Sequence, residues 1–346
     1  MSKIEWTERT WNPIAGCSVI SPGCTNCYAM TMAARIERMQ PGLHYDGLTQ
    51  PSKAGPVWTA KIGFSESILL QPLRRRKPTM YFVNSMSDLF HEGVSDDVID
   101  RVFAVMAMTP QHTYQVLTKR PDRMREYLNT TDRALIIWIK MNIIIGSDRR
   151  FIAMTGTKKP ALPLPNVWLG VSAEDQKRAD DRIPHLLATP AAVRFVSAEP
   201  LLGSVSLSRI RIAPDHHTII DALNGYAHSD NWSGSGHERT RLNWIIVGGE
   251  SGKGARPMHP DWVRSIRDQC AAASTAFFFK QWGEWFPRSE WEGNPDMILP
   301  DDECAEWPSS NNLRHMAGEI LHRVGKRRAD RKLDGVIHDA MPEVRI

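Results

Sequence analysis

Short apolar runs rich in β-branched and aromatic residues alternate along this chain with amphipathic, helix-like segments. The clearest runs predict strands, and a further strand is expected near residues 10–14. The predicted strands are 80–83, 114–117, 167–171, 193–196, 244–247 and 276–279. The helices expected between them span 26–39, 96–108, 121–128, 180–188 and 261–273. Near-continuous apolar strands that alternate with helices predict a parallel sheet covered by helices.

Polar side chains follow each of these predicted strands. In an open doubly wound sheet such groups gather mainly at one switch point, whereas a barrel brings the carboxyl ends of all its strands to one rim. The pattern therefore favours an α/β fold with a complete or partial TIM-like β/α barrel. The polar groups are Asn84, Ser85 and Asp88; Thr118, Lys119 and Arg120; Ser172 and Glu174; Ser197 and Glu199; Glu250 and Ser251; and Lys280 and Gln281.

Two segments interrupt the alternation, and both are expected to be insertions in a barrel domain spanning residues 1–285. Residues 129–165 contain an apolar helix-like run and then a basic, proline-punctuated connection, which predicts a lid or docking element. Residues 213–242 are rich in His, Ser, Gly and Asn, which is typical of a flexible loop. Residues 286–346 lack further βα units and predict a Trp-rich C-terminal extension that packs beside the barrel.

The composition of the chain is ordinary for a globular protein. Its 346 residues suit one large core with appendages, and no apolar stretch approaches the roughly 20 residues that span a bilayer. The N-terminus lacks the features of a secretory signal, so we expect a cytoplasmic protein without disulfides. The net charge is +4, and the basic runs 74–77 and 326–332 either neutralise nucleic-acid phosphates or form solvated surface.

Three cysteines near the N-terminus carry the strongest chemical signal. Cys17, Cys24 and Cys27 follow the spacing Cys-x6-Cys-x2-Cys, while Cys270 stands far away in the sequence. Thiolates are soft ligands that prefer zinc or iron–sulfur clusters. Zinc would need a fourth ligand, for which His44 is the nearest histidine, and a four-iron cluster would keep one iron free for a small molecule. Buried free thiols are the third alternative. The position after the first strand, at the catalytic rim of a barrel, favours the cluster.

The loop and the βα series resemble the radical SAM enzymes, and more closely a phage- and prophage-encoded three-cysteine family that is distantly similar to spore photoproduct lyase. The usual radical SAM motif is Cys-x3-Cys-x2-Cys with an aromatic residue before the last cysteine. Here the first gap is longer, Asn26 fills that position and Tyr28 lies on the other side. The segments that carry the resemblance are 11–13 with the cysteines, 84–90, 117–121, 166–172, 195–201, 247–252 and 279–283.

The resemblance implies that Cys17, Cys24 and Cys27 bind three irons of a 4Fe-4S cluster. The fourth iron would bind the amino and carboxylate groups of S-adenosyl-L-methionine. An external electron donor would then drive cleavage to methionine and a 5′-deoxyadenosyl radical that abstracts a hydrogen atom.

Several residues at the predicted rim are candidates for binding this cofactor. Glu199 or Glu250 could accept hydrogen bonds from its ribose or amino group, or could form ordinary salt bridges. The pair Gly248-Gly249 either allows close backbone approach to a ligand or makes a tight strand-to-helix turn. The cations that could bind the cofactor carboxylate or a substrate phosphate are Lys119, Arg120 and Lys280.

The phage-type family implies a nucleic-acid or nucleoside substrate. One hypothesis is isomerisation of a glycine-substituted thymidine in phage DNA, in which hydrogen abstraction at the glycine carbon moves the attachment from nitrogen to carbon. Trp282 and Trp285 either stack on a base or belong to the core. The alternatives are a photoproduct-lyase-like DNA repair enzyme, a zinc-stabilised nucleic-acid-binding protein without catalysis, and a barrel hydrolase that uses rim carboxylates.

Overall fold

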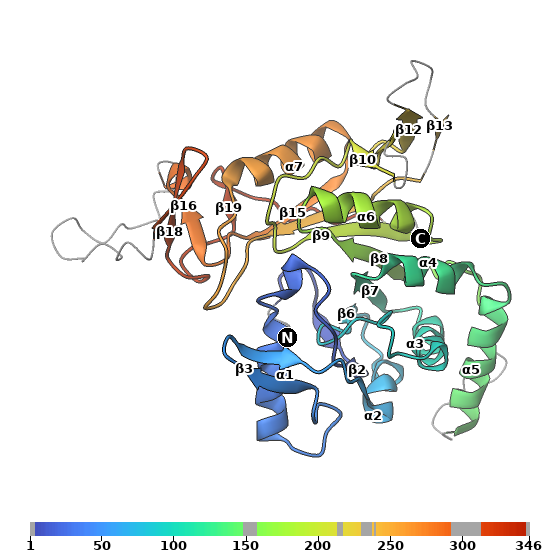
Figure 1. The fold of residues 1–346 in the computed structure, drawn as a ribbon. Helices are drawn as coiled ribbons and strands as arrows, with labels where there is room; N and C mark the ends of the chain where they lie inside the picture. Colours follow the sequence, from blue (N-terminus) through green and yellow to red (C-terminus); the bar gives the residue numbers. More distant parts are fainter. Residues whose placement is uncertain are drawn as a thin grey trace. The chain divides into compact units, whose positions relative to one another are not determined.

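The computed structural model contains a seven-stranded parallel sheet (Figure 1). Its strand order follows the sequence without a switch point, and the two strands at its edges do not pair with each other among the described residues. This is the topology of a partial barrel, so the predicted α/β class is confirmed. The strands, in order across the sheet, are β1 (Arg9–Trp11), β6 (Met80–Val83), β7 (Thr113–Thr118), β8 (Val167–Ser172), β9 (Val193–Ala198), β14 (Trp244–Gly248) and β15 (Ala276–Gln281).

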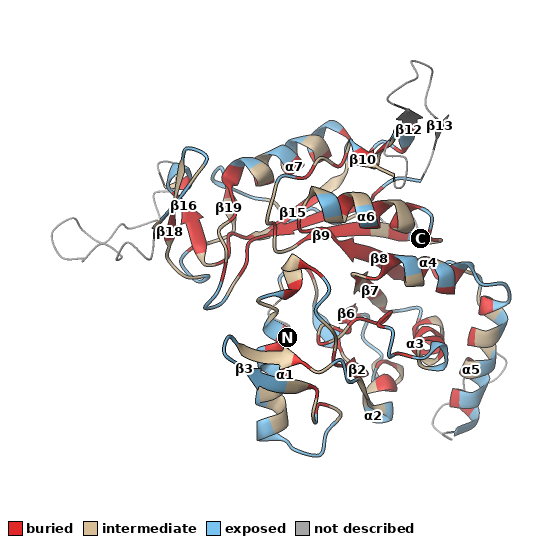
Figure 2. Cartoon of the chain, in the orientation of Figure 1, coloured by how far each residue is buried: buried red, intermediate tan, exposed pale blue. Residues whose placement is uncertain are grey.

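The structure describes residues 4–147, 158–212, 217–229, 237–238, 240–291 and 313–343. The chain divides into two compact units. Unit 1 contains Met1–Val171, Arg182–Phe195 and Val344–Ile346, and unit 2 contains Ser172–Asp181 and Val196–Glu343. In both units the central strands are almost continuously buried, as expected for a sheet covered on both faces (Figure 2).

The helices begin where local chemistry favours them. Extended Ser95 precedes α3 (Asp96–Met108), whose first turn carries two aspartates that suit the positive end of the helix dipole. Proline occupies the first position of α4 and of α7, where its missing N–H costs nothing. The remaining α-helices and the described 3-10 helices are α1 (Tyr28–Met39), α2 (Glu66–Leu69), α4 (Pro121–Asn129), α5 (Arg133–Ser147), α6 (Gln176–Leu187), α7 (Pro260–Ala272), η1 (Pro22–Cys24), η2 (Pro72–Arg74) and η4 (Arg288–Glu290). None of the described helices has the length and apolarity needed to cross a membrane.

Two small antiparallel pairs belong to unit 1. They join β2 (Ile14–Ala15) to β5 (Gly63–Phe64), and β3 (Thr49–Ser52) to β4 (Gly55–Trp58). The β3–β4 hairpin packs beside α1. The predicted insertion after α4 contains α5, which packs on α3; its residues 148–157 lie outside the described part of the chain.

The prediction of a loop over residues 213–242 is wrong for the part that the structure describes. In unit 2, β10 (Ile210–Arg211), β11 (Thr218–Asp221), β12 (Tyr226–Ser229) and β13 (His237–Glu238) form an antiparallel sheet. Ile219 and Ile220 are buried, and Gly225 turns the hairpin with a φ of 77°. The polar composition concealed this short hairpin, although Asn224-Gly225 is a strong turn signal.

The C-terminal part of unit 2 adds two further small sheets. One contains β16 (Trp285–Pro287), β18 (Glu319–Arg323) and β17 (Leu313–Met316), and the other pairs β19 (Lys332–Leu333) with β20 (Val336–Ile337). Trp282 and Trp285 are buried, and their indole N–H groups donate to the carbonyls of Lys332 and Ala255 at 2.8 and 2.7 Å. Both side chains therefore belong to the core, and the hypothesis that they stack on a base is wrong.

Candidate metal centre

The cysteine loop begins at a position that only glycine can occupy. Gly16 has a φ of 94°, and a Cβ there would lie 2.1 Å from the carbonyl oxygen of Lys61. The Gly16 N–H donates to the carbonyl of Met86 at 3.1 Å. Because an L side chain would be strained and would clash, glycine fixes the direction in which the chain enters the loop at Cys17.

Two successive turns place the other cysteines. Cys24 ends η1, and its N–H donates to the carbonyl of Ser21 at 2.9 Å. The N–H of Cys27 donates to the carbonyl of Cys24 at 3.3 Å, and Cys27 is the N-cap residue of α1. The short gap between these two cysteines is therefore a hydrogen-bonded turn that leads directly into a helix.

The segment after β6 holds the loop in place. The Ser85 hydroxyl donates to the side chain of Asn12, and the Ser87 hydroxyl donates to the carbonyl of Ile14, both at 3.1 Å. The Tyr28 hydroxyl closes the arrangement by donating to the carbonyl of Ser85 at 2.9 Å. The motif at 84–90 that carried part of the resemblance thus supports the cysteine loop.

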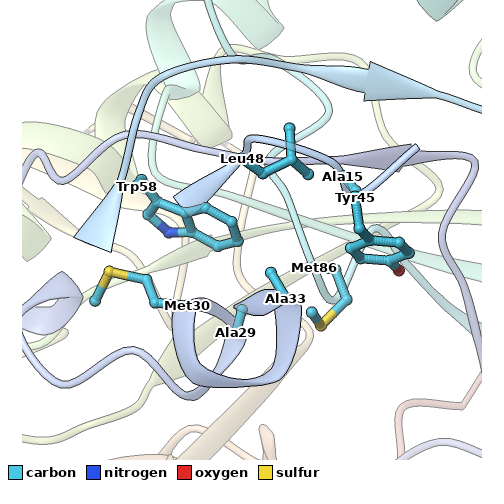
Figure 3. Packing of buried hydrophobic residues seen from close by; sticks show 8 residues of the cluster. All are labelled: Ala15, Ala29, Met30, Ala33, Tyr45, Leu48, Trp58 and Met86. Carbon is cyan, nitrogen blue, oxygen red and sulfur yellow. The ribbon is translucent and has the colours of Figure 1, made fainter. Parts of the chain in front are cut away.

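A hydrophobic cluster lies beneath the cysteines. Cys17 and Cys27 both pack against it, although they are separated by the whole loop. Figure 3 shows its side chains converging from α1, from the β3–β4 hairpin and from neighbouring loops. The members of the cluster are Ala15, Ala29, Met30, Ala33, Tyr45, Leu48, Trp58 and Met86.

The electrostatics of the thiols link the three cysteines. Burial raises the pKa of Cys17 to about 12; Asp88 and Cys24 add to this rise, and Arg120 opposes it. Burial also raises the pKa of Cys27, with Cys24 again adding and Lys119 opposing. Cys24 therefore interacts with both of the other cysteines. Burial therefore disfavours the thiolate form of Cys17 and Cys27, and metal binding, which needs the thiolate, would be coupled to release of protons.

Asp88 and Arg120 form a buried network beside the loop. β6 and β7 are parallel neighbours, so the segments after them meet at one edge of the sheet. Asp88 accepts hydrogen bonds from the Thr118 hydroxyl at 2.7 Å and from the N–H groups of Phe90 and Lys119 at 3.0 and 2.9 Å. It also pairs with Arg120 at 3.1 Å. Four donors therefore satisfy the hydrogen-bonding capacity of this buried carboxylate.

Arg120 extends this network to the cysteines. Its Nη2 donates to the Ser18 hydroxyl at 2.6 Å, and its Nη1 lies 3.8 Å from the Cys17 sulfur. His91 contacts the same hydroxyl at 3.0 Å, and burial, with Arg120 adding to it, lowers the pKa of His91. The parts played by Ser18 and His91 were not predicted from the sequence; the only signal for them was their position, Ser18 within the cysteine loop and His91 directly after the motif at 84–90.

The donor set fits an iron–sulfur cluster in its chemistry. Three thiols lie on one loop, two of them, Cys17 and Cys27, pack against one apolar cluster, and the guanidinium of Arg120 lies 3.8 Å from the Cys17 sulfur, where it would suit an anionic cluster. No group of three or more His, Cys, Asp or Glu side chains among the described residues is arranged to hold a metal ion. His44, the candidate fourth zinc ligand, has its Nε2 3.3 Å from the carbonyl of Asn12. The identity of the metal stays a prediction.

The other candidate residues at strand ends, apart from Lys119, form a polar group in unit 2. Glu199 pairs with Lys280 at 3.1 Å and accepts a hydrogen bond from the Ser197 hydroxyl at the same distance. A Cβ on Gly248 would lie 2.5 Å from Glu199 Oε1, so this glycine makes room for the carboxylate. Both partners of the Glu199–Lys280 pair keep some solvent exposure, at 15% and 18% of their side chains.

Glu250 is held more tightly. Its carboxylate accepts hydrogen bonds from the backbone N–H and the guanidinium of Arg256, at 2.6 to 2.8 Å, and is 5% exposed. A Cβ on Gly249 would lie 1.8 Å from the carbonyl oxygen of Trp282. Both glutamates therefore form salt bridges. Glycine is required at position 249 because the backbone of Trp282 leaves no room for a side chain there. Cofactor binding by these residues stays a prediction.

A partly open groove of about 710 Å³ lies elsewhere on unit 1. Its lining comes from the end of α1, from the following loop and from residues before and within α2, and it includes Met39, Leu43, His44 and Phe64. It does not include the three cysteines. The groove shares Tyr45 and Ile36 with the hydrophobic cluster against which Cys17 and Cys27 pack.

The fold and the loop define an α/β partial-barrel protein with a three-cysteine motif after its first strand. The chain belongs to the DUF5131 family, described as a protein of unknown function, whose family profile matches residues 1–342. Comparison with curated proteins finds no match, and comparison with solved structures finds none either. The family match runs through both compact units, so the C-terminal small sheets belong to the family as much as the cysteine loop does.

Proposed function

We propose that this protein is an iron–sulfur enzyme of the radical SAM type. The observation that carries the proposal is the three-cysteine loop itself. Gly16 fixes its start, a hydrogen-bonded turn joins Cys24 to Cys27, and a buried guanidinium lies beside Cys17. Cys17, Cys24 and Cys27 would hold three irons of a 4Fe-4S cluster. When bound, the cluster would supply the electron that cleaves S-adenosylmethionine and so gives access to hydrogen-atom abstraction.

The chain's own groups support an anionic cluster better than a bare structural metal. The buried Arg120 brings a positive charge to the loop, and Lys119 lowers the pKa of Cys27 against the effect of burial. A zinc-stabilised binding protein would need a fourth ligand, and His44 is already engaged with the backbone. Glu199, Gly248, Gly249, Glu250, Lys119 and Lys280 remain the candidate residues for S-adenosylmethionine.

For the substrate we propose a modified nucleobase, with glycinyl-thymidine of phage DNA as the specific candidate. This rests on the resemblance to the phage-type family. The reaction would be an isomerisation that begins with hydrogen abstraction at the glycine carbon. Repair of an ultraviolet-induced thymine dinucleotide is the second candidate, because the same resemblance extends distantly to spore photoproduct lyase.

The test is the formation of 5′-deoxyadenosine by the full-length protein. The protein is reconstituted with iron and sulfide without oxygen, and then receives dithionite and S-adenosylmethionine with DNA that contains glycinyl-thymidine. We expect 5′-deoxyadenosine and a changed nucleoside by mass spectrometry, and loss of both in Cys24→Ser. Cys270→Ala is the matched control, because Cys270 is a buried free cysteine of α7 outside the loop. A reconstituted protein with an intact cluster that forms no 5′-deoxyadenosine would contradict the radical mechanism.

A further inference from the structure

We infer that Arg120 is the positioning residue of the cysteine loop, which fixes Cys17 and presents a cationic donor to the sulfur that would bind the cluster. The inference rests on the proposed function and extends it to a residue outside the cysteine motif. It predicts that Arg120 sets the reduction potential of the cluster.

Arg120 makes two sets of contacts: one with two carboxylates, called the anchor side here, and one with the cysteine loop, called the target side. On the anchor side, Nε donates to Glu92 at 2.8 Å and Nη1 donates to Asp88 at 3.1 Å. On the target side, Nη2 donates to Ser18 at 2.6 Å and Nη1 lies 3.8 Å from the Cys17 sulfur. The guanidinium thus links the segments after β6 and β7 to the first cysteine.

Only arginine can make this set of contacts. Its planar fork carries five N–H donors in fixed directions, whereas a lysine ammonium is a single point at the end of a flexible stem. The side chain is 5% exposed, so rotation to other partners is restricted by packing as well as by hydrogen bonds. Lysine at this position would keep the charge but could not reach the carboxylates and the loop together.

The charge of Arg120 is stable in this buried position. Two carboxylates pair with the guanidinium, Asp88 at 3.1 Å and Glu92 at 2.8 Å, and the side chain of arginine always carries its charge in proteins. A fixed positive charge and an N–H donor at a ligating sulfur stabilise the more negative, reduced form of a cluster. Arg120 should therefore raise the reduction potential.

The experiment compares Arg120→Lys and Arg120→Met with Arg133→Lys. Arg133 is also 5% exposed and also pairs with a buried aspartate, but its contacts lie on α3 and α4 and not on the cysteine loop. Each full-length protein is reconstituted without oxygen, its iron content is measured, and its midpoint potential is determined by a titration followed by electron paramagnetic resonance. Ser18→Ala is included because it removes the Nη2 contact without leaving a buried charge unpaired.

We expect more negative potentials in the order Arg120→Met, Arg120→Lys and Ser18→Ala, with the wild-type potential in Arg133→Lys. Loss of iron from Arg120→Met, with iron retained in Arg133→Lys, would also support the positioning role. If the Arg120 and Ser18 variants keep both the iron and the wild-type potential, the inference is overturned while the proposed function stands. A wild-type protein that binds no iron under these conditions overturns both.

Discussion

Two buried arginines in unit 1 have nearly the same surroundings but different targets. Arg120 pairs with buried Asp88 and exposed Glu92, and Arg133 pairs with buried Asp100 and exposed Asp96. Each buried aspartate also accepts a hydroxyl hydrogen bond at 2.7 Å, from Thr118 in the first network and from Tyr127 in the second. Removing an ion pair from water is costly, and additional hydrogen bonds offset this cost. Both networks supply such hydrogen bonds to their buried aspartates.

The remaining donors distinguish the two networks. Arg133 donates to the carbonyl of Tyr127 and lies 3.8 Å above the ring of the same residue, so its network closes within the helices. Arg120 directs its remaining donors to Ser18 and Cys17. Burial and ion pairing alone therefore do not mark a functional arginine. What distinguishes Arg120 is that its remaining N–H groups reach the cysteine loop.

The largest expected effect comes from neutralising the buried aspartates. Asp88→Asn and Asp100→Asn should each destabilise the protein by about 3–5 kcal/mol, because each leaves a buried guanidinium without its main partner. Urea denaturation of the metal-free proteins measures this loss. Only Asp88→Asn should also reduce the iron bound after reconstitution, and equal iron contents in the two variants would remove the distinction between the networks.

Removing the matched hydroxyls should have a smaller effect. Thr118→Val and Tyr127→Phe each delete a hydrogen bond to a buried carboxylate, which contributes about 1.5–3 kcal/mol to the free energy of unfolding. The same denaturation experiment applies. The Thr118 hydroxyl also accepts a hydrogen bond from the backbone N–H of Arg120. Thr118→Val should therefore shift the reduction potential of the cluster, and Tyr127→Phe should not. A changed reduction potential in both variants would show that a general loss of stability in unit 1 is enough to change the potential, without a specific role for the Arg120 network.

The smallest effect is expected from the exposed carboxylates. The side chains of Glu92 and Asp96 are 67% and 56% exposed, so Glu92→Gln and Asp96→Asn should each cost less than about 1 kcal/mol. Thermal unfolding at moderate salt measures the difference. A loss of several kcal/mol in Glu92→Gln would mean that the anchor of Arg120 depends on the exposed carboxylate more than on Asp88.

The contribution of Glu92 should also depend on pH. Its partial burial opposes ionisation, but the hydrogen bond from Arg120 lowers the pKa of Glu92 below its ordinary value of 4.5. A carboxylate with a depressed pKa in the folded state stabilises the protein above the unfolded pKa, and this stabilisation is lost as the pH falls through the folded pKa. The melting temperatures of wild type and Glu92→Gln should therefore differ at pH 7 and converge below pH 4.5.

Much of the fold could be predicted from the sequence because its signals are local. The apolar run at 80–83 and the periodic segment at 96–108 coincide with β6 and α3. The antiparallel sheet containing β11 and β12 was missed because its strands have only two to four residues each and lie in a polar segment. Short strands of this kind are stabilised by pairing with one another, which composition does not reveal.

The candidate site was predictable only in part. The spacing of Cys17, Cys24 and Cys27 predicts that they share one metal centre, and this stays a prediction. Arg120 lies 103 positions from Cys17, and their contact depends on the parallel pairing of β6 with β7 and on the positive φ of Gly16. Polar residues at the ends of both strands were recognised, but which of them meet at the loop is determined by the register of the sheet.

The iron and acid-labile sulfide content of the anaerobically reconstituted protein shows whether the three cysteines hold an iron–sulfur cluster. The wild type and Cys270→Ala should each bind about four irons and four sulfides per chain, and Cys17→Ser, Cys24→Ser and Cys27→Ser should each lose most of both. Stoichiometric zinc without iron in the wild type, or undiminished iron in the three loop variants, would contradict the assignment of Cys17, Cys24 and Cys27 as ligands of an iron–sulfur cluster.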